Sequence, residues 1–116
     1  MLKILKLLKS NKIIKNYAIL DSKKGKDFYY LKIEAKLIDD STLFIRTYVS
    51  VTSYLYSYHW QDKTGQLKIR WDNAPHHQNL KTFPHHKRTP KIEESEEIRL
   101  EDILKRIEDK LNFTKP

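Results

Sequence analysis

The sequence predicts an α+β protein: a five-stranded antiparallel sheet with a short N-terminal helix and an amphipathic C-terminal helix packed on one face. Three observations lead to this fold class. Both chain ends carry apolar residues at helical spacing, the middle is rich in short β-branched and aromatic runs, and tight-turn sequences rather than helices separate these runs. At 116 residues, the whole chain (1–116) is predicted to form a single domain.

The N-terminal helix is predicted for residues 1–10. Leu2, Leu5 and Leu8 recur at helical spacing with lysines between them. These lysines interrupt every apolar run, so we expect neither a signal peptide nor a membrane span, which needs roughly 18 apolar residues. A basic amphipathic helix can lie on a membrane. A segment this short buries little area, however, and we expect it to pack on the protein's own sheet.

The sheet is predicted for residues 13–72. Its strands come from the runs KIIKNYAILDS, FYYLKIEAKLID, TLFIRTYVSV, YLYSYHWQ and LKIRWD. Asp39-Asp40-Ser41 forms the tight turn between the second and third runs, and DKTG (residues 62–65) joins the last two. Because short turns and no helices connect these runs, we expect consecutive strands to form antiparallel hairpins and not a parallel sheet.

The C-terminal helix is predicted for residues 99–112. One face of this segment collects the apolar side chains Leu100, Ile103, Leu104, Ile107 and Leu111. Residues 73–91 are predicted to form an irregular, histidine-rich loop, because Pro75 and Pro84 favour turn or extended geometry at the residues before them.

The DKTG turn decides which side chains share a face. A type I turn with Gly65 left-handed in a G1 bulge opposes Gln61 to Leu67. The face then carries aromatic and charged side chains together, a platform on which bases can stack: Tyr56, Tyr58, Trp60, Lys68, Arg70 and Asp72. A plain even-numbered loop places His59 with Lys68 and Arg70 and gathers the aromatics in a core. We favour the bulged register, under which His59 is a hydrogen-bonded core residue.

The formal net charge of +8 is unevenly distributed along the chain. Residues 1–90 hold 17 Lys and Arg against 7 Asp and Glu, whereas residues 91–116 hold 6 against 8. A basic body with an acidic tail indicates a polyanionic partner, with nucleic acid first. The alternative is a lysine-rich, solvated surface. The chain has no cysteine, which excludes disulfides and thiolate metal sites and suits a reducing cytosol.

Four of the five histidines form two doublets in the loop, each after a proline: His76-His77 and His85-His86. Three interpretations compete. In the first, histidines from both doublets and Asp72 bind a metal, although the spacing matches no known zinc pattern. In the second, they cleave RNA without metal. In the third, they have a structural role, with DNAP (residues 72–75) as an Asx turn.

Metal-free RNA cleavage needs few groups. The RNA 2′-hydroxyl is the nucleophile, and the protein supplies a base, an acid and fixed cations for the developing phosphorane charge. Histidine suits both proton transfers, and Arg70, Lys87 and Arg88 supply cations. Asp72 is then available to orient a histidine. The sequence offers no carboxylate cluster of the kind that holds two magnesium ions.

These residues resemble the TumE-type family, the toxins of bacterial and archaeal toxin–antitoxin operons. The similarity is carried by YSYHWQ, Gly65, RWDNAPHH, TFPHHKR and the later LEDIL. It is dense over residues 54–88, weaker at the C-terminal helix and essentially absent from the first 25 residues. In the family the second doublet is often followed by lysine and another histidine, but Arg88 stands here, which keeps a cation and no histidine. The resemblance implies a small cytoplasmic toxin with a cognate antitoxin, often one with a helix-turn-helix domain.

The leading hypothesis is therefore an RNA-directed toxin without metal or other cofactor. One histidine of each doublet acts as base or acid, phosphate is bound by Arg70, Lys68, Lys87 and Arg88, and Tyr58 or Trp60 stacks on a base. The alternatives are a non-catalytic module that sequesters RNA or protein, and a metal-dependent hydrolase. We expect no membrane association, and a homo-oligomer is compatible with the sequence.

Overall fold

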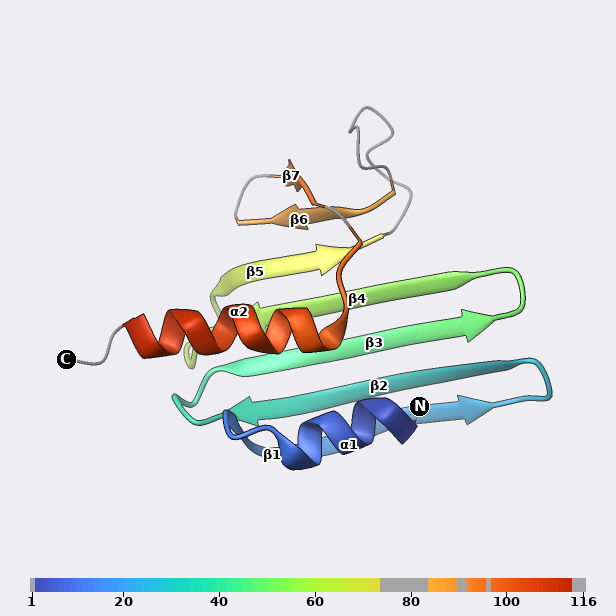
Figure 1. Ribbon diagram of the computed structural model, residues 1–116, viewed down its shortest axis with the longest axis horizontal. Coiled ribbons are helices and arrows are strands. Elements are labelled where there is room, and N and C mark those ends of the chain that lie inside the picture. Colours follow the sequence, from blue (N-terminus) through green and yellow to red (C-terminus); the bar gives the residue numbers. More distant parts are fainter. Residues whose placement is uncertain (1, 74–83, 90–91, 96, 114–116) are drawn as a thin grey trace.

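The computed structural model describes residues 2–73, 84–89, 92–95 and 97–113. Within these residues, a seven-stranded antiparallel sheet carries two helices, and the strands lie in chain order from β1 to β7 (Figure 1). The α+β class, the antiparallel pairing and the two helices predicted from the sequence are confirmed. The predicted number of five strands is wrong.

The helices and strands follow the predicted order with two additions. In chain order they are α1 (Leu2–Ser10), β1 (Ile14–Lys24), β2 (Phe28–Leu37), β3 (Thr42–Ser50), β4 (Tyr54–Gln61), β5 (Leu67–Asp72), β6 (His86–Arg88), β7 (Ile92–Glu94) and α2 (Leu100–Phe113).

Of the two additions, β6 lies within the segment predicted to be an irregular loop, and β7 begins directly after that segment. β6 pairs with β5 through Asp72↔His86, Trp71↔Lys87 and Arg70↔Arg88, and β7 pairs with β6. A three-residue run of polar residues shows no alternation that would reveal a strand. β6 is a strand because the edge of β5 offers backbone N–H and C=O groups that need partners.

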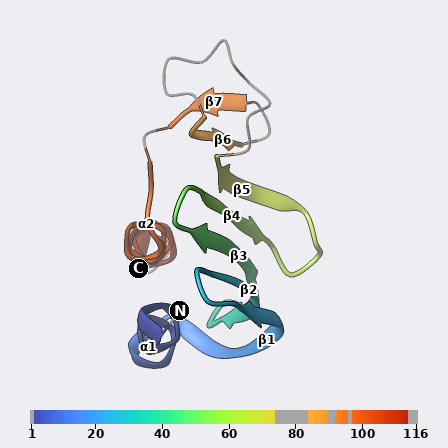
Figure 2. The same cartoon turned by 90° about the vertical axis from the view of Figure 1, so that its right-hand side faces the viewer.

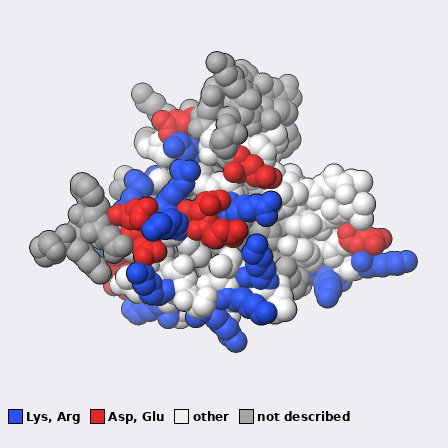
Figure 3. Space-filling model, in the orientation of Figure 1, with Lys and Arg blue, Asp and Glu red and all other residues white. Residues whose placement is uncertain are grey.

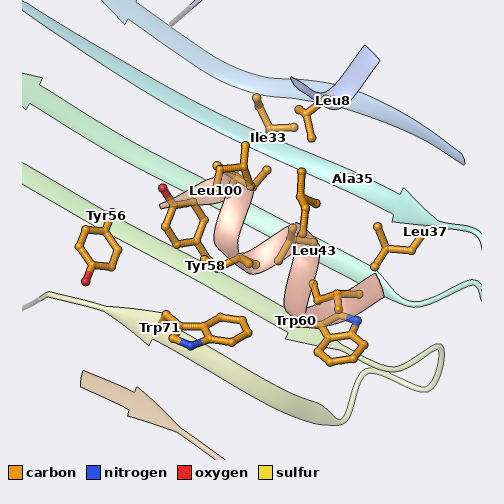
Figure 4. Close-up of a cluster of buried hydrophobic side chains, with 14 of the residues drawn as sticks. Leu8, Ile33, Ala35, Leu37, Leu43, Tyr56, Tyr58, Trp60, Trp71 and Leu100 are labelled. Atoms are coloured by element: carbon orange, nitrogen blue, oxygen red, sulfur yellow. The ribbon is translucent and has the colours of Figure 1, made fainter. Parts of the chain in front are cut away.

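Both helices lie on the same side of the sheet (Figure 2), which we call the covered face. The side chains between helices and sheet form the core (Figure 4). Its fully buried members are Leu8, Leu31, Ile33, Leu37, Leu43, Ile45, Tyr58, Trp60, Trp71, Ile103, Leu104 and Ile107. Burial alternates along β2 and β3 as a half-buried antiparallel sheet requires, so every second side chain points away from the helices.

The side without helices, which we call the open face, carries mostly polar and charged residues. Across β2 to β6 they form two rows of directly paired positions. One row is Lys32, Arg46, Ser57, Asp72 and His86; the other is Glu34, Phe44, His59, Arg70 and Arg88. The helices therefore leave a charged sheet surface uncovered.

Candidate functional site

The hairpin between β4 and β5 determines which predicted site residues meet. Gly65 has φ of +91°, its N–H donates to the Asp62 carbonyl at 3.0 Å, and the Asp62 N–H donates to the Gln66 carbonyl at 2.9 Å. The predicted turn with a left-handed Gly65 is thus present, and Gln61 opposes Leu67 as expected.

A second irregularity reverses the predicted faces. The register shifts between Gln61↔Leu67 and Trp60↔Ile69, so Lys68 is an extra residue in β5. From there on, His59 pairs with Arg70 and Tyr58 with Trp71. Because one extra residue moves every later side chain to the other face, the favoured platform of aromatic and charged residues is wrong. His59 joins Arg70 on the open face, as in the alternative register.

Tyr58 and Trp60 are not available for stacking on RNA bases. Their exposed fractions are 2% and 1%, and both lie beneath the helices. The Trp60 Nε1–H donates to Ser41 Oγ at 2.9 Å, and Lys68 Nζ lies 4.4 Å from the centre of the Trp60 ring. The predicted stacking role is therefore corrected to a core role, with Lys68 held over the Trp60 ring on the covered face.

Asp72 joins Arg70 and His86 on the open face. The Arg70 Nε–H donates to Asp72 Oδ2 at 3.2 Å, and His86 Nε2 lies 2.9 Å from Asp72 Oδ1. The other ring nitrogen of His86, Nδ1, lies 3.0 Å from the Pro84 carbonyl oxygen. A carboxylate and a carbonyl accept only, so both bonds form only when both ring nitrogens carry hydrogen. His86 is 5% exposed, so Asp72 and the Pro84 carbonyl hold its ring in a fixed orientation within the sheet.

His59 lies at the other end of the same chain of contacts. The Arg70 guanidinium donates to His59 Nδ1 at 3.3 Å, and His59 Nε2 lies 3.1 Å from Gln61 Oε1. These partners select the neutral ring with hydrogen on Nε2. Burial and, secondly, the Arg70 cation lower the pKa of His59, which agrees with a neutral ring.

His85 points to the opposite side of the sheet from His86, because adjacent residues of an extended chain alternate. His85 Nδ1 lies 2.8 Å from the Tyr56 hydroxyl, and the two rings stack with centres 5.7 Å apart. Burial is the main cause that raises the pKa of Tyr56, so its hydroxyl stays protonated and can donate. The first doublet, His76 and His77, lies outside the described residues.

The predicted phosphate-binding cations are split between the two faces. Arg70 and Arg88 pair directly on the open face, whereas Lys87 pairs with Trp71 on the covered face and borders a hollow lined by α2 residues. The structure adds two cations that sequence reasoning missed, Lys32 and Arg46, which are directly paired on the open face.

Two hollows adjoin each other on the open face. One, of about 410 Å³, is lined by side chains that include Tyr30, Tyr48 and Leu55. The other, of about 320 Å³, is lined by residues that include Lys32, Phe44 and His59. Both share the residues Arg46, Ser57 and Arg70. A larger hollow of about 630 Å³ on the covered side lies beside α2, among lysines, an arginine and Asp109. The open-face hollows combine cations with aromatic rings, and we regard them as the candidate site.

The alternation in TLFIRTYVSV could have pointed to this site. Phe44, Arg46 and Tyr48 occupy every second position, which places them on one face of any strand. The other face of the same run, with Ile45, Thr47 and Val49, is only slightly more apolar. Sequence alone therefore did not reveal which side the helices would cover.

No three side chains of His, Cys, Asp or Glu converge into a metal-binding group among the residues that the structure describes. Of the two doublets, only the second lies within the described residues. Within the described ranges, no helix has both the length and the apolar character needed to cross a membrane.

The comparison with protein families decides the class of the protein. The family model described as Toxin TumE matches residues 4–111, nearly the whole chain. The chain belongs to the TumE toxin family. Family membership confirms the resemblance seen in the sequence, and it implies a toxin function and a cognate antitoxin as partner. Searches of curated proteins and of solved structures found no match.

Proposed function

We propose that this TumE-family toxin acts on RNA, and that the open face of the sheet binds the RNA backbone. The observation that supports this most is the direct pairing of Lys32 with Arg46 across β2 and β3. Like charges at directly opposed positions destabilise a sheet, and neither side chain has an ion-pair partner among the described residues. Asp21 is the acidic residue directly paired with Lys32 across β1 and β2, and a phosphate group would supply further negative charge between Lys32 and Arg46.

The neighbouring row of the open face adds two more cations. Arg70 and Arg88 pair on β5 and β6, so four cationic side chains lie on one sheet surface. A polyanion that follows this surface gains from each neutralised phosphate through counterion release. Of the acidic residues on this face, Asp72 is 8% exposed and engaged with Arg70 and His86, so it contributes little repulsion toward a bound phosphate. Asp21 and Glu34 lie at the β1 and β2 ends of the two rows.

For the chemical step we propose metal-independent cleavage with histidine as acid and base. A base removes the proton of the 2′-hydroxyl, whose oxygen attacks the adjacent phosphorus. The bond to the 5′-oxygen breaks, and an acid protonates that oxygen, leaving a 2′,3′-cyclic phosphate and a 5′-hydroxyl. The proposed acid and base come one from His76 or His77 and the other from His85 or His86. The His86 ring is buried on the open face with a partner at each nitrogen, whereas His85 lies on the covered side beside Tyr56. Cleavage by His85 therefore requires the bound RNA to reach past the open face to that side of the sheet.

A second candidate function is toxicity by sequestration, in which RNA is bound without turnover. It is favoured by the contacts of the described histidines: both ring nitrogens of His59 and of His86 already have partners. Side chains engaged in this way are suited to fixing the shape and charge of the surface. This candidate shares the RNA-binding face with the first and differs only in the chemical step.

One experiment separates the proposals. Purified protein is incubated with total RNA in excess EDTA, and cleavage and binding are measured in parallel for wild type, the variant Lys32→Gln/Arg46→Gln, and a matched control on the helix side, Lys105→Gln/Arg106→Gln. We expect loss of RNA binding in the first variant only. Equal binding by all three proteins contradicts the proposed face.

The chemical step is tested with His76→Ala/His77→Ala and His85→Ala, which leave the buried His86 in place. Cleavage should fall at least about 100-fold in each, follow a bell-shaped pH profile centred at about 6 to 7, and leave cyclic phosphate ends. Full cleavage in all variants contradicts histidine chemistry. RNA binding without any cleavage by the wild type contradicts catalysis and supports sequestration.

A further inference from the structure

β3 places an arginine between two aromatic residues on the open face. Phe44, Arg46 and Tyr48 alternate with the buried Ile45 and Thr47, so the three side chains point to the same side. At the rise of an antiparallel strand, Arg46 lies about 7 Å from each aromatic residue along the strand, and the two aromatics are about 13 Å apart.

The two aromatic residues mark the two open-face hollows, and Arg46 borders both of them. Neither ring is isolated. Phe44 meets the His59 ring edge-on with centres 6.1 Å apart, and Tyr48 stacks with Phe28 at 6.0 Å. Rings held by neighbouring rings lose little further freedom when a ligand stacks on them, which favours binding of planar groups.

From this arrangement we infer that the Phe44–Arg46–Tyr48 stripe is a binding site for single-stranded RNA. One unstacked base occupies the hollow beside Phe44, another occupies the hollow beside Tyr48, and the phosphate between them lies on Arg46 and its cross-strand partner Lys32. The inference deepens the proposed function and rests on it, because it specifies which form of RNA the open face accepts.

The spacing is what selects a single strand. Neighbouring bases in a duplex are stacked at a rise of about 3.4 Å, whereas the two hollows are centred on residues about 13 Å apart. A strand with splayed bases can place one base beside each aromatic residue, whereas adjacent stacked bases are too close together to do so. Sequence-tolerant binding of single strands typically combines a cationic track with aromatic rings, and each stacked base contributes substantially. An acidic polypeptide would use the cations and leave the aromatic rings without a planar partner.

The test measures binding of a fluorescent single-stranded oligouridylate of about eight nucleotides, a duplex RNA of the same length, and polyglutamate of matched charge. Three substitutions are compared at one salt concentration: Phe44→Leu, Tyr48→Leu and Arg46→Gln. The matched controls lie on the covered side, Tyr29→Leu for the aromatic residues and Arg106→Gln for the arginine. Circular dichroism confirms that each variant is folded before its affinity is used.

We expect the wild type to bind the single strand at least about tenfold more tightly than the duplex. Phe44→Leu and Tyr48→Leu should each weaken single-strand binding about 5- to 100-fold and leave duplex binding nearly unchanged. Arg46→Gln should weaken both RNAs and reduce the slope of log affinity against log salt by about 0.7 on the single strand. The control variants should behave as wild type.

Failure of the inference differs from failure of the proposed function. Equal affinity for single strand and duplex, with both aromatic variants binding like wild type, overturns the stacking site while an effect of Arg46→Gln still supports RNA binding on this face. Polyglutamate binding as tight as the single strand overturns recognition of bases and indicates an acidic protein as ligand. Absence of binding to any RNA overturns both proposals.

Discussion

The replacement Asp72→Asn is predicted to lower the free energy of unfolding by about 2–3 kcal/mol. Asp72 is 8% exposed and accepts hydrogen bonds from Arg70 Nε at 3.2 Å and His86 Nε2 at 2.9 Å. Asparagine keeps one acceptor oxygen, but its amide nitrogen must face one of these two N–H donors. The substitution therefore removes a negative charge and turns a donor toward one of the two N–H groups, so one of the two hydrogen bonds is lost.

The magnitude follows from how well water can replace each lost contact. A hydrogen bond to a charged group contributes about 1.5–3 kcal/mol. The Arg70 side chain is 37% exposed, so solvent compensates much of its loss. The His86 side chain is 6% exposed and has no such compensation. The predicted loss of about 2–3 kcal/mol is thus mainly the buried hydrogen bond to His86, with a small contribution from the bond to Arg70. For a chain of this size, such a loss lowers Tm by about 8–12 °C.

The assay is urea unfolding followed by the fluorescence of the two buried tryptophans, Trp60 and Trp71. The control is Asp109→Asn, which disrupts an exposed pair with Lys105 and should cost about 0.5 kcal/mol or less. A cycle with His86→Gln should give a coupling energy of about 1–3 kcal/mol. A loss for Asp72→Asn no larger than that for Asp109→Asn, or a coupling near zero, would refute the reasoning.

Three further predictions concern the hairpin, the pH dependence and the core. Gly65→Ala should lower the free energy of unfolding in urea by about 1–2 kcal/mol, because the backbone φ of +91° is unfavourable for a residue with a Cβ atom. A steric clash is not the cause, since no atom lies within 4 Å of the position of that Cβ. An unchanged free energy of unfolding would contradict this prediction. Burial and Arg70 hold the pKa of His59 below 6.5, so the unfolded chain takes up this proton first and stability falls as the pH drops through that range. The free energy of unfolding of His59→Gln should therefore fall less than that of the wild type between about pH 7.5 and pH 5. An equal fall in both proteins would argue against a lowered pKa for His59. Trp60→Leu should cost about 3 kcal/mol yet leave the RNA affinity of the folded protein within about twofold, whereas a large loss of affinity would restore Trp60 to the RNA-binding surface.

The sequence predicted those parts of the fold that depend on local patterns. The C-terminal helix, predicted for residues 99–112, forms as Leu100–Phe113, and its apolar stripe does enter the core. The turn at Asp62–Gly65 also follows local chemistry, since Asp62 Oδ1 accepts from the Thr64 and Gln66 N–H groups and only a glycine readily adopts the conformation at position 65.

The errors arose where the outcome depends on pairing partners distant in sequence. No residue type near Lys68 indicates a bulge at that position. The contact of the Lys68 side chain with the Trp60 ring is seen only once β4 and β5 are paired. That single extra residue decides whether Trp71 or Arg70 shares the covered face with Trp60. The contact between Asp72 and His86 likewise needs β6, which forms because β5 would otherwise expose an edge.

The positions of the acidic residues explain why the open face keeps a net positive charge. The C-terminal segment carries more acidic than basic residues, but α2 lies on the covered face, where acidic and basic side chains are interspersed (Figure 3). There Glu108 pairs with Lys12 at 2.9 Å and Glu101 approaches Lys3 at 3.8 Å. The acidic helix thus neutralises lysines of the N-terminal segment on its own side of the sheet. The sheet separates these carboxylates from the open face, where Asp21, Glu34 and Asp72 share the rows of paired positions with the four cations Lys32, Arg46, Arg70 and Arg88. The cations there outnumber the acidic residues, so an anionic strand is attracted to the face that has no helices.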